Sequence, residues 1–121
     1  MIKIAHRGNM FGPQPEHENS EHAINASIRA GFDVEIDIWK FDDLLFLGHD
    51  LDNLAICNLE TLDFLIKHKK NLWIHCKNLN SLKFFFSLKH ENFNFFFHNT
   101  DDYTLTSHGF IWSHGSNNPF D

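Results

Sequence analysis

The stretch DVEIDIW, residues 33–39, is the most informative segment of the chain. Side chains alternate between the two faces of a strand, so its valine and isoleucines share one face while Glu35 and Asp37 share the other. Two carboxylates on one face stay ionised in a protein interior only at high cost, unless a cation or a base lies between them. The alternative is a half-exposed strand whose acidic face meets solvent. The stretch therefore predicts a strand that carries either an acidic site or a solvated edge.

A second strand pattern, LLFLG at residues 44–48, follows after only a few residues. A parallel crossover needs about a dozen residues or more, so the two strands are predicted to form an antiparallel hairpin. If His49 and Glu35 are to face one site, they must lie opposite each other, and that register requires a three-residue connection at 41–43. A two-residue turn would direct the His49 ring toward the apolar face.

Helical and extended patterns alternate along the rest of the chain. Apolar residues recur at intervals of three and four in the helical patterns, whereas the strands are short apolar runs. The predicted helices are 20–30, 58–70 and 79–90, with a helical turn at 101–106. The other predicted strands are 2–5, 72–76, 93–97 and 110–113. This alternation is typical of the α/β class.

The composition limits the organisation of the chain and its partners. A length of 121 residues, 42% of them hydrophobic, suits one domain, 1–121, with a single core. The formal net charge of -6 and the scattered ten Lys and Arg argue against a nucleic-acid partner. Polar residues interrupt every apolar run, so no membrane span is expected.

The cysteines and the first residues indicate a compartment. Cys57 and Cys76 are far apart and form no CxxC pair, so neither a zinc knuckle nor a disulfide framework is indicated. The chain begins without the charged and apolar regions of a signal peptide. We therefore expect a cytoplasmic protein.

Polar side chains gather where the predicted strands end. Catalytic groups of α/β sheets come from such positions, because the loops after parallel strands meet at one edge. These strand-end residues are His6, Arg7, His49, His75, Lys77 and His98. The other histidines are interpreted as structural or exposed: His17, His22, His68, His90, His108 and His114.

Four short motifs occur in order in the first half of the chain: AHRGN at 5–9, ENSEHAI at 18–24, GFDVEIDIW at 31–39 and LGHD at 47–50. Together they resemble the glycerophosphodiester phosphodiesterase family, within the phosphatidylinositol phospholipase C-like phosphodiesterases. The resemblance implies an α/β, TIM-barrel-like fold with a β-hairpin after the second strand. A full barrel takes about 250 residues, so we expect a trimmed or incomplete one.

The resemblance also implies acid, base and phosphate-binding roles. The histidines of the HRG and HD motifs act as acid and base in that family, which assigns these roles to His6 and His49. Arg7 would hold the phosphate. With Lys77 it would offset the charge that develops in the transition state.

A divalent metal is the cofactor that the resemblance implies. The family's ExD carboxylates bind it, which assigns Glu35 and Asp37, and the glutamate of the PENT-like motif adds Glu18. Here two residues, Glu16 among them, separate that glutamate from the preceding proline, so either acidic residue can occupy the position. His75 stands where the family's fourth-strand motif has a metal-binding glutamate. Oxygen ligands favour Mg²⁺ or Ca²⁺, and an imidazole also admits Mn²⁺ or Zn²⁺.

The expected function is a metal-dependent phosphodiesterase that acts on a small glycerophosphodiester-like molecule, in lipid metabolism. Attack by water would make it a hydrolase, and attack by a substrate hydroxyl would make it a lyase that forms a cyclic phosphate. The alternative is a non-catalytic phosphate- or metal-binding remnant of the same fold, which the short chain favours. An incomplete barrel would leave an unpaired edge or an apolar flank, so we also expect a homo-oligomer that covers it with the phenylalanines at 84–86 and 93–97.

Overall fold

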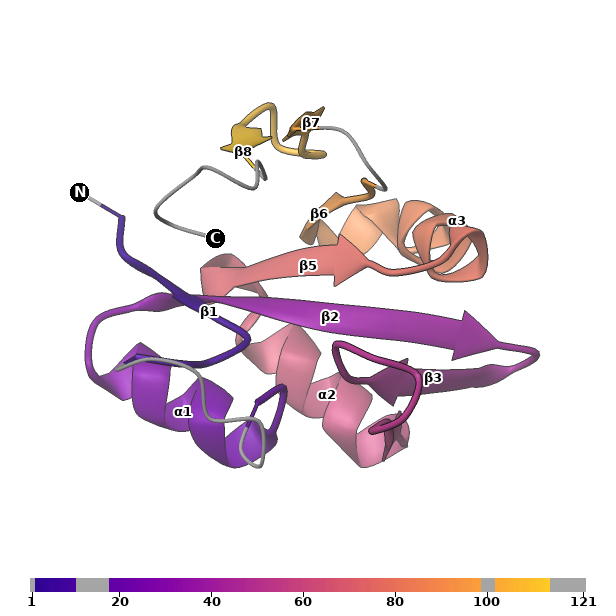
Figure 1. Ribbon diagram of the computed structural model, residues 1–121, viewed down its shortest axis with the longest axis horizontal. Coiled ribbons are helices and arrows are strands. Elements are labelled where there is room, and N and C mark those ends of the chain that lie inside the picture. Colours follow the sequence, from indigo (N-terminus) through magenta and orange to yellow (C-terminus); the bar gives the residue numbers. More distant parts are fainter. Residues whose placement is uncertain (1, 11–17, 99–101, 114–121) are drawn as a thin grey trace.

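The structure is a computed structural model that describes residues 2–10, 18–98 and 102–113 (Figure 1). Some positions discussed above lie outside these ranges: Glu16, His17, His114 and the first residue of the turn predicted at 101–106. The described residues form three α-helices and eight strands in two sheets.

The larger sheet is mixed and has six strands in the order β4-β3-β2-β5-β6, with β1 paired to β2. The strands are β1 (Ile4–His6), β2 (Asp33–Phe41), β3 (Leu44–Leu47), β4 (Ala55–Cys57), β5 (Leu72–Cys76) and β6 (Asn94–Phe96). β1, β2, β5 and β6 run parallel, whereas β3 and β4 run antiparallel to their neighbours. β2 is central because it pairs with β1 along its first half, with β3 along its second half and with β5 on the other side.

The helices pack on the apolar face of this sheet. They are α1 (Glu21–Arg29), α2 (Leu59–Lys67) and α3 (Leu79–Ser87), and short 3₁₀ turns follow the last two at Lys69–Asn71 and Lys89–Glu91. Each α-helix begins at a polar N-cap whose side chain accepts a backbone N–H of the first turn: Ser20, Asn58 and Asn78. One core joins a side chain from each helix, Ile24, Leu65 and Phe85, to the apolar face of β2. None of the helices in the described ranges has the length and apolar content of a membrane span.

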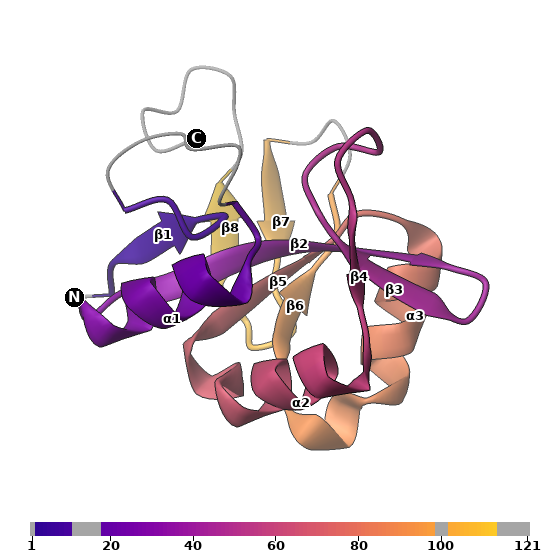
Figure 2. The same ribbon diagram turned by 90° about the horizontal axis from the view of Figure 1, so that it is seen from below.

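A second, two-stranded sheet consists of β7 (Tyr103–Leu105) and β8 (Ile111–Ser113). Figures 1 and 2 show this hairpin and the helices α1 and α2 on opposite sides of β2. Trp112 attaches it by stacking on Phe96, with ring centroids 4.7 Å apart. The helical turn predicted at 101–106 is wrong over its described part, because residues 103–105 pair with β8 instead of bonding locally.

The expected trimmed TIM-barrel-like fold is also wrong. The described strands form one open mixed sheet and a separate hairpin, and they do not close into a barrel. The antiparallel strands β3 and β4 occupy one end of the larger sheet. At the other end, beyond β6, Ser107 takes the place of a further strand: its Oγ accepts the Phe95 N–H at 2.8 Å, and its own N–H donates to the Phe95 carbonyl at 2.8 Å.

Candidate functional site

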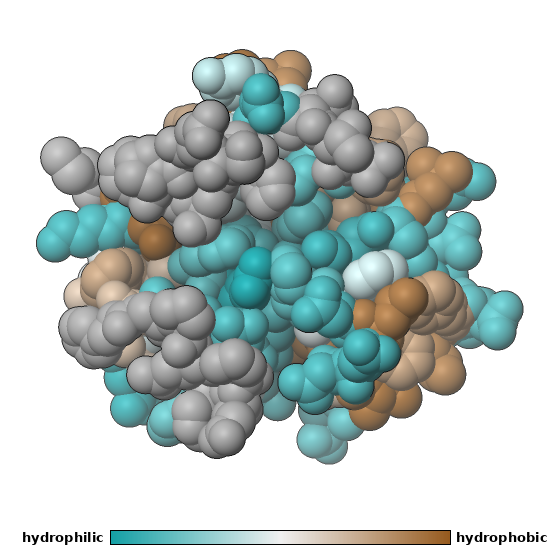
Figure 3. All heavy atoms as spheres, in the orientation of Figure 1, coloured by the Kyte–Doolittle hydropathy of each residue, from teal (hydrophilic) through white to brown (hydrophobic). Residues whose placement is uncertain are grey.

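A pocket of about 280 Å³ lies on the acidic side of β2, where β1, β5 and β6 end. Figure 3 shows hydrophilic side chains gathered near the middle of the face seen in that view. The residues that line the pocket are His6, Arg7, Glu35, Asp37, Trp39, His49, His75, Lys77, His98 and Trp112. Seven of the eight residues that the sequence assigned to the site are therefore together, and Glu18 lies next to them.

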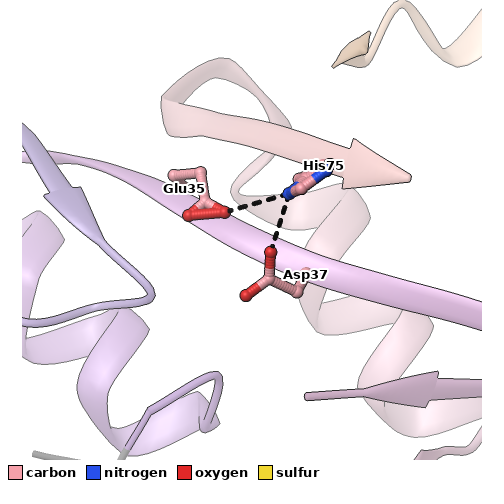
Figure 4. Close-up of side chains that lie close together, drawn as sticks. All are labelled: Glu35, Asp37 and His75. Carbon is pink, nitrogen blue, oxygen red and sulfur yellow. Dashed lines mark hydrogen bonds and ion pairs between the residues drawn. The ribbon is translucent and has the colours of Figure 1, made fainter. Parts of the chain in front are cut away.

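Glu35, Asp37 and His75 form the floor of the site (Figure 4). The parallel register places Asp37 opposite His75, whose Nδ1 lies 3.0 Å from Asp37 Oδ1 and 3.9 Å from Glu35 Oε1. Both carboxylates are buried, with Glu35 1% and Asp37 0% exposed. The alternative of a solvated acidic edge is therefore wrong.

These three residues fit a divalent cation. One ligand atom from each lies within 4.8 Å of the other two. Neither oxygen of Glu35 meets a donor in hydrogen-bond geometry, although both are buried. Buried carboxylate oxygens of this kind need a cation or a proton. Two carboxylates and an imidazole suit Mn²⁺ or Zn²⁺ and also admit Mg²⁺.

The two carboxylates differ in their affinity for protons. Burial, followed by the charge of Asp37, raises the pKa of Glu35 well above its ordinary value. Burial alone would also raise the pKa of Asp37, but the hydrogen bond from His75 and the charge of Lys77 help to hold it below the usual range. In the absence of a cation the pair therefore keeps a proton on Glu35, and a bound cation would displace it.

His6 ends β1, and its Nε2 lies 3.3 Å from Oε2 of Glu35. Burial, with the nearby charge of Arg7, lowers the pKa of His6 from 6.5 to about 4. The ring is therefore neutral near pH 7, and the contact with Glu35 is not an ion pair at that pH. A neutral imidazole in the pocket can accept a proton from a substrate.

The β2–β3 hairpin does not have the predicted connection. Strand pairing runs from Phe41 opposite Leu44 to Ile38 opposite Leu47, so two residues, Asp42 and Asp43, form the turn. Asp42 has a left-handed φ of 52°. The three-residue connection is wrong, and a regular continuation of this ladder would direct His49 toward the apolar face.

His49 nevertheless lines the pocket, because regular pairing of β3 with β2 ends at Leu47 and Gly48 follows. Gly48 adopts a φ of +156°, donates its N–H to the Asp37 carbonyl and accepts the Trp39 Nε1–H at 2.8 Å. A Cβ on Gly48 would lie 2.7 Å from the backbone oxygen of Asn53. A glycine that breaks the ladder is therefore what brings His49 to the acidic side.

Two cationic side chains line the same pocket. Arg7 lies between two carboxylates, with Nη1 3.6 Å from Glu18 and Nε 3.6 Å from Asp37. Lys77 follows β5, and its Nζ lies 5.8 Å from the centre of the Trp39 ring. Both are placed to attract an anion.

Glu18 is not part of the three-residue floor. Its Oε1 accepts the Asn9 Nδ2–H at 2.9 Å, and its Oε2 contacts Arg7. It lines a smaller neighbouring pocket of about 70 Å³, which it shares with His49. Among the described residues, Glu18 thus supports Arg7 and does not join Glu35 and Asp37.

Four residues of the site had no assigned role in the sequence: Asn19, Trp39, His98 and Trp112. His98 stacks on His75 with ring centroids 4.2 Å apart. Its position directly after a predicted strand is the sequence feature that could have placed it in the site. Asn19 contacts Asp37. Its neighbour in the ENS motif, Glu18, was assigned to the site and could have pointed to it. Trp112 had none, because its place depends on how the β7–β8 hairpin docks. No protein-family model, curated protein or solved structure matches this chain.

Proposed function

We propose that this protein is a metal-dependent phosphodiesterase that acts on a glycerophosphodiester-like substrate. One observation carries the proposal: two histidines and two cationic side chains share a pocket with a buried carboxylate pair. The pair has the ligand chemistry of a divalent cation site, and the other four side chains supply proton transfer and anion binding. The four motifs of the sequence add support.

The charge of the site favours a phosphodiester over a phosphomonoester. A divalent cation that displaces the Glu35 proton would leave three carboxylates, of Glu35, Asp37 and Glu18, beside two permanent cations, Arg7 and Lys77. Together with the two charges of the cation, this leaves one positive charge. A phosphodiester carries one negative charge and would neutralise it, whereas a monoester carries nearly two at pH 7.

The histidines divide the proton transfer in this proposal. His6, neutral near pH 7, accepts a proton from the attacking water or substrate hydroxyl. His49, with its Nδ1 3.1 Å from Asp50 Oδ1, donates a proton to the leaving alkoxide. Arg7 and Lys77 hold the phosphate. A bound divalent cation would polarise a phosphoryl oxygen.

The test is hydrolysis of bis(p-nitrophenyl) phosphate by the full chain, with Mn²⁺, Zn²⁺, Mg²⁺, Ca²⁺ or chelator, beside p-nitrophenyl phosphate. We expect metal-dependent cleavage of the diester that falls at least ~100-fold in His6→Ala and His49→Ala, since general acid-base catalysis contributes about that much. His90→Ala is the matched control, because that ring is 68% exposed and lies outside the pocket. Cleavage that chelator leaves unchanged would contradict the proposal.

The same experiment distinguishes the proposed enzyme from the alternative, a non-catalytic binding module. Binding of Mn²⁺ and phosphate without turnover of either ester would favour the non-catalytic binding module.

The compartment proposed for either function is the cytoplasm, because Cys57 and Cys76 are both free and buried, as suits a reducing environment.

A further inference from the structure

We infer that Asn19 is a positioning residue of the metal site, which fixes the Asp37 carboxylate in the orientation that ligation requires. The inference rests on the metal-binding part of the proposed function. Asn19 lies directly before Ser20, the N-cap of α1, and is only 4% exposed. Its amide makes two hydrogen bonds to Asp37, one to the backbone and one to the side chain.

The backbone hydrogen bond fills a gap between two strands. β1 pairs with the residues of β2 up to Glu35, and β3 pairs with β2 from Ile38 onward. The N–H of Asp37 lies between these ladders, and Asn19 Oδ1 accepts it at 2.7 Å. The amide therefore takes the place of a strand between the two ladders, where β2 changes neighbours.

The side-chain hydrogen bond sets the rotation of the carboxylate. Asn19 Nδ2 donates to Asp37 Oδ2 at 3.2 Å, while His75 Nδ1 lies 3.0 Å from Oδ1. The two oxygens have different partners on different elements, so the group cannot turn without losing one of them. Oδ1 is thereby kept toward His75 and Glu35, where the ligand atoms meet. Partners of this kind orient metal ligands and raise metal affinity.

Asn19 is itself held in place. Its N–H donates to the Arg7 carbonyl at 2.9 Å, which ties it to the end of β1. Its φ is 56°, in the left-handed region that asparagine tolerates better than most residues. The start of α1, the end of β1 and the middle of β2 therefore meet at one amide.

The test is the affinity for Mn²⁺, measured by calorimetry on the full chain with Asn19→Gly. Glycine accepts the left-handed backbone and removes only the amide. Asn92→Gly is the matched control, because Asn92 has a φ of 61° and is exposed, far in sequence from the site. We expect Asn19→Gly to weaken Mn²⁺ binding by about 10- to 100-fold and the control to bind as the wild type does. An Asn19→Gly protein that folds and binds within twofold of the wild type would overturn the inference.

If the glycine variant does not fold, Asn19→Asp tests the positioning role of Asn19. It keeps the size and the acceptor for the Asp37 N–H, but an ionised carboxylate cannot donate to Oδ2. Added negative charge alone would tighten cation binding, so weaker Mn²⁺ binding supports positioning, and equal or tighter binding overturns it. If neither variant folds, or if the wild type binds no Mn²⁺, the inference also fails. Mn²⁺ binding that depends on Asn19 in a chain that cleaves no ester would leave the inference standing and remove the catalytic proposal.

Discussion

The Nδ1 atom of His75 lies 3.0 Å from Oδ1 of Asp37, across the parallel strands β5 and β2. The contact joins an imidazole nitrogen to a carboxylate at the floor of the site, at the position where the family that the motifs resemble has a metal-binding glutamate.

His75→Glu should make folding depend on a divalent cation. Three carboxylates would then meet in a buried site, and their repulsion and desolvation destabilise the protein unless a cation is bound. We expect the melting temperature to fall in chelator and to rise with Ca²⁺ more than that of the wild type, because oxygen ligands favour Ca²⁺. His68→Glu, outside the pocket, is the control. A melting temperature that Ca²⁺ does not change would contradict this prediction.

Glu35→Gln should stabilise the cation-free protein at alkaline pH. The folded state holds the Glu35 proton to higher pH than the unfolded chain, whose pKa is 4.5, so stability falls as pH rises above that value. The amide removes this dependence. We expect the free energy of unfolding at pH 8 in chelator to rise by at least ~1 kcal/mol, the value of about one pKa unit. Urea denaturation at pH 5 and pH 8 measures it, with the exposed Glu60→Gln as control.

His6→Asn should reduce the loss of stability in mild acid. The pKa of His6 is about 4 in the folded state and 6.5 in the unfolded chain, so the unfolded state binds more protons between these values. Stability therefore falls as pH drops from 6.5 to 4, and asparagine removes this contribution. Denaturation at several pH values in that window measures the slope, with His90→Asn as control. Equal slopes in the wild type and His6→Asn would exclude the assigned shift.

Gly48→Ala should cost more than Gly31→Ala. Both glycines have positive φ, which costs about 1–2 kcal/mol with a side chain. A Cβ at Gly31 meets nothing within 4 Å, whereas at Gly48 it meets Asn53 and Leu54 at 2.7 and 2.8 Å. Overpacking should add about 1–3 kcal/mol and displace His49 from the pocket. The difference between the two variants in urea denaturation isolates that extra cost.

Self-association should involve the β7–β8 hairpin. Of the phenylalanines expected to cover a flank, Phe85, Phe93 and Phe96 are buried, whereas Phe86 is 60% exposed. The β7–β8 hairpin adds a pair of exposed apolar side chains, since Leu105 is 64% and Ile111 67% exposed. We expect light scattering at micromolar concentration to show a dimer that Leu105→Lys with Ile111→Lys dissociates. A wild-type monomer would show this expectation to be wrong.

The local pattern of β2 was sufficient to predict the strand, its apolar face and its acidic face. Alternation determines which residues share a face, and burial of Val34, Ile36 and Ile38 follows from it. It was not sufficient to predict that Glu35 and Asp37 are both buried, because that depends on what covers the other face.

The connection of the β2–β3 hairpin could not be predicted from the sequence. The three-residue connection follows from placing His49 opposite Glu35 only if the ladder stays regular up to His49. Gly48 interrupts the ladder, so a two-residue turn and a pocket-facing His49 coexist. Likewise the barrel expectation came from motifs in the first half of the chain, which carry no information about how the strands after β5 are arranged.

Ser107 occupies backbone groups at the outer edge of β6. The outer backbone of β6 would otherwise offer free N–H and C=O groups to a strand of another molecule, which is how edge strands template aggregation. Ser107 occupies the N–H and carbonyl of Phe95 and also donates to the Phe93 carbonyl, while Thr104 donates to that of Phe97. Two hydroxyl side chains and one loop amide thus cover the backbone along the β6 edge of this small sheet. A closed barrel has no such edge to cover.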